Sequence, residues 1–173
     1  GAPHYTSGIV LLAKILGAEH ISYPEGEDEA GADDALHARS EQIKANGGKP
    51  YVIHLGLDHP PLGALGYVAA GLELCGQMDD FDAVVVPSGS GATHGGLLTG
   101  LRLAGQSASV HGICVRRDHQ QQQHRVKTVL HKLSKLLDID PQMTTDDILT
   151  WDGALAPGYG KMGPGTQHAL SLM

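Results

Sequence analysis

The feature that most constrains this 173-residue chain is the stretch VVVPSGSGATHGG at residues 84–96. A run of three valines stops at Pro87, four glycines follow within eight residues, and apolar residues then return at helical spacing. This pattern predicts a strand, a glycine loop and a helix. Glycines let successive backbone N–H groups converge on one point, and the helix N-terminus adds positive charge there, so the loop is suited to an anion. Ser88, Ser90 and Thr93 are expected to add hydroxyl donors.

The anion that this loop suits best is a phosphate, because a phosphate has enough oxygens to accept from several donors at once. GATHGG lacks the lysine of a G-K-[ST] loop, so nucleoside triphosphate hydrolysis is not expected. A dinucleotide site is the alternative, since Gly89, Gly91 and Gly95 approximate a G-x-G-x-x-x-G pattern. Where such a site has an acidic residue for the ribose, this chain has Arg116 and Arg117, which suit the 2′-phosphate of NADP.

Strand and helix patterns alternate along the rest of the chain. Strands are predicted at residues 19–23, 50–55, 82–86 and 109–115. Helices are predicted at 6–17 (capped by Thr6 or Ser7), 35–48, 64–75, after the glycine loop, from Val126 onward and at 163–173, with a short helix capped by Thr144 or Thr145. The glutamine run 120–123 is interpreted as a polar lead-in without chemistry of its own. This order predicts an α/β fold with a mostly parallel, doubly wound sheet and helices on both faces, and a ligand beyond the carboxyl ends of the strands.

Composition excludes several classes of function. The net charge is −7 and the twelve Lys and Arg residues are scattered, so nucleic acid is not an expected partner. No apolar run is long enough for a membrane span and no leader pattern is present, which predicts a soluble, cytoplasmic protein. Cys75 and Cys114 are expected to be free thiols, and the spacing of His119, His124 and His131 does not favour a metal site.

Four stretches of the chain carry a resemblance to a known family. SGSGATHGG after its valine-rich strand resembles the cofactor-phosphate loop of the pyridoxal-phosphate (PLP) enzymes that include D-cysteine desulfhydrase, 1-aminocyclopropane-1-carboxylate (ACC) deaminase and cysteate sulfo-lyase. LLAKILGAEHISYP, KPYVI with PLGALGYVAAGLEL, and WDGALAPGYG are similar to further family segments in the same order. The resemblance implies the tryptophan synthase β-like fold (PLP fold type II). It implies that residues 1–48 are a remnant of the smaller domain and 49–173 part of the larger one, which together form one α/β unit.

The same resemblance implies roles for individual residues. The cofactor phosphate is expected to lie against the backbone of the loop, which comprises Gly89, Ser90, Gly91, Ala92 and Thr93. Tyr159 is expected on the substrate side of the cofactor ring, as a catalytic residue, and the substrate is expected to be a small amino acid. The GLDHPP segment departs from the family pattern, which leaves Asp58 and His59 without an assigned role. His94 has two interpretations, as a residue of the helix start or as a contact near the cofactor.

Two family segments have no counterpart in this sequence. These are the G-G-N-K motif with the Schiff-base lysine and the E-G-x-x-x-D-P-x-Y segment; Lys161 is interpreted as an exposed loop residue and not as a substitute. We therefore expect an internal fragment of a PLP lyase or deaminase that is inactive alone and self-associates through uncovered apolar faces. The alternative is a non-catalytic α/β protein that binds a phosphorylated metabolite or NADP, or that self-assembles.

Overall fold

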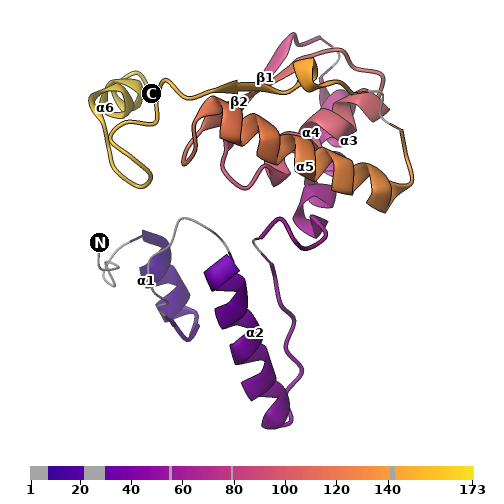
Figure 1. Ribbon diagram of the computed structural model, residues 1–173. Helices are drawn as coiled ribbons and strands as arrows, with labels where there is room; N and C mark the ends of the chain where they lie inside the picture. Colours follow the sequence, from indigo (N-terminus) through magenta and orange to yellow (C-terminus); the bar gives the residue numbers. More distant parts are fainter. Residues whose placement is uncertain (1–7, 22–29, 55, 79, 141–142) are drawn as a thin grey trace. The chain divides into compact units, whose positions relative to one another are not determined.

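The computed structural model describes residues 8–21, 30–54, 56–78, 80–140 and 143–173 (Figure 1). The chain divides into two compact units, Gly1–Gly56 and Leu57–Met173. The predicted boundary between two domain pieces lies earlier, after residue 48. Residues 50–54 belong to the first unit, and the N–H of Gly56 donates to Asp33 Oδ2 at 2.8 Å within that unit. The assignment of the two units to a smaller and a larger domain of a complete enzyme stays a prediction.

The first unit contains two helices, α1 (Gly8–Ile15) and α2 (Ala30–Ala45). The predicted strand at 50–55 is wrong for residues 50–54, which form no strand, and residues 19–21 form none either; residues 22, 23 and 55 lie outside the described part. Tyr51 and Ile53 are 81% and 73% exposed, so their apolar character does not reflect burial in a sheet here. The predicted caps Thr6 and Ser7 also lie outside the described residues.

The second unit carries the α/β architecture. Its elements are α3 (Leu62–Gln77), β1 (Ala83–Ser88), α4 (Ala92–Leu103), β2 (Ser109–Cys114), α5 (His119–Leu137), a 3-10 turn (Thr145–Asp147), β3 (Leu149–Trp151) and α6 (Pro164–Ser171). The sheet has the order β1-β2-β3 and both pairs are parallel, with Ser88 opposite Cys114 and Ile113 opposite Trp151. The parallel sheet and the final helix are as predicted. Thr144 caps the 3-10 turn through a reciprocal capping box with Asp147.

The core of this unit lies between one face of the sheet and the helices. Val86 and Val110 point into it and pack with Leu98 and Leu101 of α4 and Val126 of α5. α4 and α5 lie along this face, and α3 packs against α4 (Figure 1).

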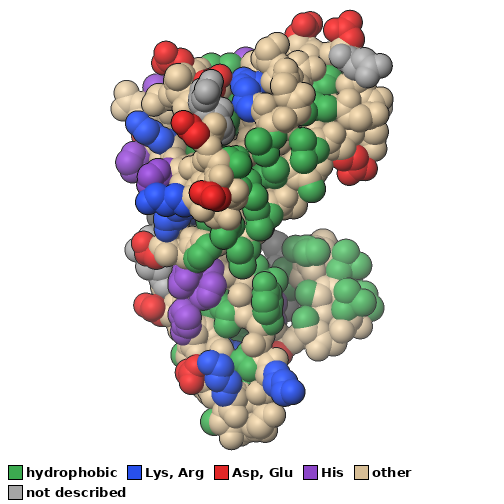
Figure 2. All heavy atoms as spheres, turned by 90° about the vertical axis from the view of Figure 1, so that its right-hand side faces the viewer, with side chains coloured by type: hydrophobic (Ala, Val, Ile, Leu, Met, Phe, Trp, Pro, Cys, Tyr) green, Lys and Arg blue, Asp and Glu red, His purple; other side chains and the backbone are tan. Residues whose placement is uncertain are grey.

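The opposite sheet face is exposed among the described residues. Val85 is 66% and Trp151 56% exposed, and with His111, Ile113 and Leu149 they line a shallow, mostly apolar hollow. Helices α4 and α5 pack on the other face of the sheet, whereas the sequence pattern predicts helices on both faces. Hydrophobic side chains reach the surface at several further places on the side of the molecule that Figure 2 shows. Within the described segments, no helix is both long and apolar enough to cross a membrane.

Helix α4 is buried along most of its length because its glycines admit close neighbours. A Cβ on Gly96 would lie 2.4 Å from the carbonyl oxygen of Ala64 in α3, and a Cβ on Gly100 would lie 2.4 Å from that of Val68. A Cβ on Gly95 would lie 3.0 Å from Val129 Cγ1 in α5. These glycines therefore hold α4 in place between its neighbours.

Candidate functional site

The loop between β1 and α4 lies at the carboxyl end of the sheet, where the sequence predicts a ligand. β1 ends at Ser88, which is paired with Cys114 at the end of β2. Residues 89–91 then turn the chain into α4, which begins at Ala92. Helices adjacent to a parallel sheet point their N-termini toward this edge, and ligands of open α/β folds bind there.

Gly91 makes the turn into α4 because its backbone is left-handed, with φ 84° and ψ −11°. A residue with a side chain is strained in this conformation, whereas glycine is not. The first bond of the helix joins the N–H of Gly95 to the carbonyl of Gly91 at 2.8 Å. The preceding N–H groups of α4 have no intrahelical acceptor by the geometry of a helix start, and the Ser90 hydroxyl accepts from one of them, that of Ala92, at 3.3 Å.

The loop residues differ in how far they reach solvent. Ser90 is exposed, Gly89, Ala92 and Thr93 are half-buried, and Gly91 is buried. Exposed Ser90 and the free N–H groups of α4 thus lie together at the positive end of a helix dipole. Such an arrangement attracts an anion.

The structure contradicts the expectation that Ser88 contributes a donor to the anion site. It was expected to offer a hydroxyl to the anion, but it is 1% exposed and faces the core. Its Oγ accepts from Gln122 Nε2 at 2.8 Å and lies 3.4 Å from His94 Nδ1. Its position is the consequence of strand alternation, because Val86 and Ser88 share the buried face of β1.

His94 is fully buried against β2, where a Cβ on Gly112 would lie 2.3 Å from His94 Nδ1. Burial lowers the pKa of His94 from 6.5 to about 4, an effect that the backbone of Val110 partly opposes and that the nearby His111 reinforces. The imidazole is therefore neutral at physiological pH. Of its two interpretations, the structure supports the helix-start residue, with its ring turned into the core.

Tyr159 lies in the loop after β3 and is 69% exposed. The guanidinium carbon of Arg116 lies 5.4 Å from the centroid of its ring, a cation–π geometry. Because Arg116 follows the end of β2, this contact brings Tyr159 to the same carboxyl edge of the sheet as the glycine loop. Lys161 is exposed nearby in sequence.

The polar residues of α5 behind the loop were not found from sequence. Gln122, inside the glutamine run interpreted as a lead-in, is fully buried, and Arg125 is 6% exposed. Both bond to the loop, as does Arg117, whose Nη1 donates to the carbonyl of Gly89 at 3.3 Å. The helical spacing of these residues could have revealed their burial. Gln122 and Arg125 are spaced i and i+3 with Val129 at i+7, so the two polar residues share the apolar, buried face of the helix.

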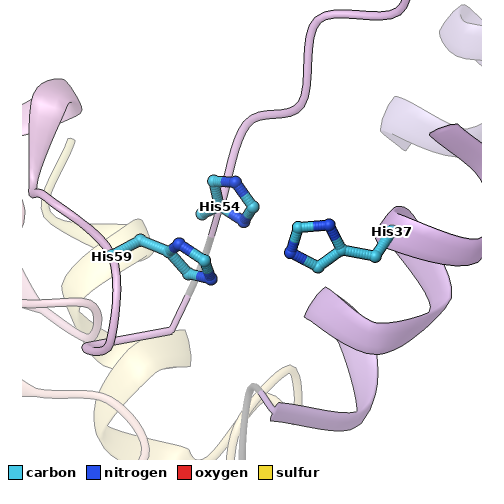
Figure 3. A group of neighbouring side chains, drawn as sticks. All are labelled: His37, His54 and His59. Carbon is cyan, nitrogen blue, oxygen red and sulfur yellow. The ribbon is translucent and has the colours of Figure 1, made fainter.

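The first unit holds a separate pair of histidines, His37 and His54, whose ring centroids are 5.0 Å apart (Figure 3). His54 Nδ1 lies 3.5 Å from Asp33 Oδ1, and the other oxygen of this carboxylate accepts from Gly56. His59, the third residue in Figure 3, belongs to the second unit. We assign no metal ion to the pair, because two imidazoles are fewer than the three or four protein ligands of ordinary zinc sites.

Comparisons with known proteins give a consistent result. Residues 2–159 match the family model described as "Pyridoxal-phosphate dependent enzyme". The chain is 31% identical over 169 residues to an ACC deaminase of Rhizobium rhizogenes, covering 95% of this chain and 50% of that protein. It is 36% identical over 173 residues to a D-cysteine desulfhydrase of Klebsiella pneumoniae, covering 98% of this chain and 51% of that protein.

A solved structure supports the same assignment. A crystal structure of an ACC deaminase homologue superposes with a TM-score of 0.73 at 30% identity, covering 88% of this chain and 46% of that one. The present chain spans about half the length of the curated relatives that it matches. With a family model matched over most of its residues, and a fold shared with a solved relative, this chain belongs to the pyridoxal-phosphate dependent enzyme family.

Proposed function

We propose that this chain carries the phosphate-binding half of the active site of a PLP-dependent lyase or deaminase. The substrate would be a small amino acid, in a reaction of the D-cysteine desulfhydrase, ACC deaminase or cysteate sulfo-lyase type. The observation that carries the proposal is the left-handed Gly91 between β1 and α4, which turns the glycine loop into the N-terminus of a buried helix.

The residues present fit the phosphate of PLP. The proposed cradle is the backbone of Gly89, Ser90, Gly91, Ala92 and Thr93, in which the Ala92 N–H already donates to Ser90 Oγ at 3.3 Å. The Ser90 and Thr93 hydroxyls are proposed as further donors. A dianion matches this set, because the loop and helix start provide several donors at one point together with the helix dipole. The PLP ring, when bound, acts as an electron sink for the amino acid. The contribution of these residues is to hold the phosphate and thereby fix where the ring lies.

We place Tyr159 on the substrate side of the site. Its exposure leaves the hydroxyl free to meet a substrate, and the Arg116 cation against its ring supports this orientation at the carboxyl edge of the sheet. From this edge the Tyr159 hydroxyl is proposed to hold or move a proton at the reacting amino acid.

We propose that catalysis needs a lysine that is not among those of this chain. In such an enzyme a lysine activates the cofactor by covalent attachment and also serves as a base. None of the lysines of this chain lies in a matching sequence context. The chain alone is accordingly expected to be inactive. Its two free cysteines and net charge of −7 are compatible with a cytoplasmic location, which we also propose.

The proposal is tested by titrating the chain separately with PLP and with pyridoxal, which lacks the phosphate, and following absorbance. We expect saturable binding of PLP, at least tenfold weaker binding of pyridoxal, and no lysine labelled after borohydride reduction, checked by mass spectrometry. Equal affinity for the two compounds, or no binding of PLP, would refute the phosphate site. A reduced, labelled lysine would overturn the inference that the attachment residue lies elsewhere.

A further inference from the structure

Helix α5 makes a set of buried hydrogen bonds to the back of the glycine loop. Gln122 Nε2 donates to the carbonyl of Gly89 at 3.2 Å as well as to Ser88 Oγ at 2.8 Å. Arg125 Nε donates to the carbonyl of Ser90 at 2.9 Å. Two successive loop carbonyls therefore point toward α5.

The direction of these carbonyls fixes the direction of the N–H groups that an anion needs. In a planar trans peptide, the C=O of one residue and the N–H of the next point in opposite directions. Because the carbonyls of Gly89 and Ser90 point toward α5, the N–H groups of Ser90 and Gly91 point away from it. They join the free N–H groups at the start of α4 as donors for an anion.

We propose that Gln122 and Arg125 are positioning residues that hold the glycine loop in its anion-binding orientation. Neither needs to touch the anion. This inference rests on the proposed function, because it assigns these side chains to the phosphate site.

The chemistry of each side chain suits this task. The Gln122 amide nitrogen has two hydrogens, and both are used, one on the end of β1 and one on the loop. Its Oε1 is buried and, within the described residues, has no hydrogen-bond partner, so the two donated bonds set the orientation of the amide. Arg125 adds a positive charge directly behind the loop, and this charge favours a dianion on the other side.

The substitutions that test the proposal are Gln122→Met, which keeps the length of the side chain and removes its donors, and Arg125→Met, which keeps an unbranched apolar stem and removes the guanidinium. The matched controls lie on the same helix. Gln121→Met makes the same chemical change at an exposed position, and Lys127→Met removes the same charge at an exposed position. Arg125→Lys keeps the charge, can reach one carbonyl, and serves as the conservative variant.

The readout is the affinity of each variant of the chain for inorganic phosphate and for PLP, measured against pyridoxal, with the backbone amide resonances of Ser90 and Gly91 followed by NMR. We expect Gln122→Met and Arg125→Met to weaken phosphate and PLP binding about tenfold, to leave pyridoxal binding unchanged, and to reduce the phosphate-induced shifts of these amides. The controls should bind as the unaltered chain does, and Arg125→Lys should recover part of the loss.

The outcomes separate this inference from the proposed function. If the unaltered chain binds neither phosphate nor PLP, the proposed function fails and this inference fails with it. If the unaltered chain binds and the folded variants bind equally well, the positioning role alone is refuted. If either methionine variant does not fold, Arg125→Lys and Gln122→Asn replace them, because both keep a polar group with a shorter or altered reach. A lower ratio of PLP affinity to pyridoxal affinity in these variants supports the positioning role, and an unchanged ratio refutes it.

Discussion

The packing of α4 against α3 predicts a large difference between two glycine-to-alanine substitutions. A Cβ on Gly100 would lie 2.4 Å from the Val68 carbonyl oxygen and 3.1 Å from the Gly71 Cα, both backbone atoms of α3. Relief of this overlap requires the whole helix to move, because no flexible side chain can yield. A Cβ on Gly66, in α3, meets nothing within 4 Å. Both glycines are helical, so both alanine variants gain similar helix propensity, about 0.5–1 kcal/mol.

Overpacking of a core costs about 1–3 kcal/mol, so the free energies of unfolding of Gly100→Ala and Gly66→Ala should differ by about that amount. Gly66→Ala should be more stable than the unaltered chain and Gly100→Ala less stable. Urea unfolding followed by circular dichroism measures both, and equal slopes against urea concentration show that the comparison is valid. Equal stability of the two variants would refute the close contact of α3 with α4 at Gly100.

The remaining predictions concern acid stability and self-association. The pKa of buried His94 is lowered to about 4, so between pH 6.5 and pH 4 the unfolded chain takes up a proton that the folded chain does not. The free energy of unfolding therefore falls by about 3 kcal/mol as the pH is lowered from 6.5 to 4. His94→Gln should flatten this part of the pH profile of the urea midpoint, while His124→Gln, at an exposed position, should not; parallel profiles for all three proteins would contradict the assignment. The exposed sheet face at Val85 and Trp151 is expected to drive self-association, because parallel sheets are normally covered on both faces. The double variant Val85→Lys/Trp151→Lys should lower the associated fraction measured by sedimentation more than the control Leu136→Lys on α5 does. If the unaltered chain sediments as a monomer, the expectation is wrong.

Sequence reasoning was most successful where one local pattern determines the structure. The β1–α4 loop, the helix that follows it, the parallel β1–β2 pair and the Thr144 cap each depend on neighbouring residues whose chemistry is specific, and each is present. The family resemblance was carried by the same kind of short, ordered motif. It is confirmed by the family model and by the solved relative.

Reasoning from local patterns failed where a partner elsewhere in the fold decides the outcome. The PYVIHL segment has strand composition, but residues 50–54 pair with no strand. β3 is only three residues long and exists because β2 offers it an edge. Ser88 looked like a ligand donor and instead faces the core, while Gln122 looked like a solvated residue and is fully buried. Composition cannot distinguish these cases, because the same polar group serves either a ligand or a neighbouring element.

The glycines of the motif have two separate physical roles, which changes how the motif is interpreted. Gly91 is required for its left-handed backbone at the loop itself. Gly95, Gly96 and Gly100 lie inside α4, where they admit α5 and α3 at distances that a side chain would prevent. A helix held this closely on two sides cannot shift its N-terminus, so its free N–H groups keep a fixed direction without contact from the ligand. The anion site is therefore a consequence of core packing as much as of the loop, and a substitution as distant from it as Gly100→Ala is expected to weaken phosphate binding through the position of α4.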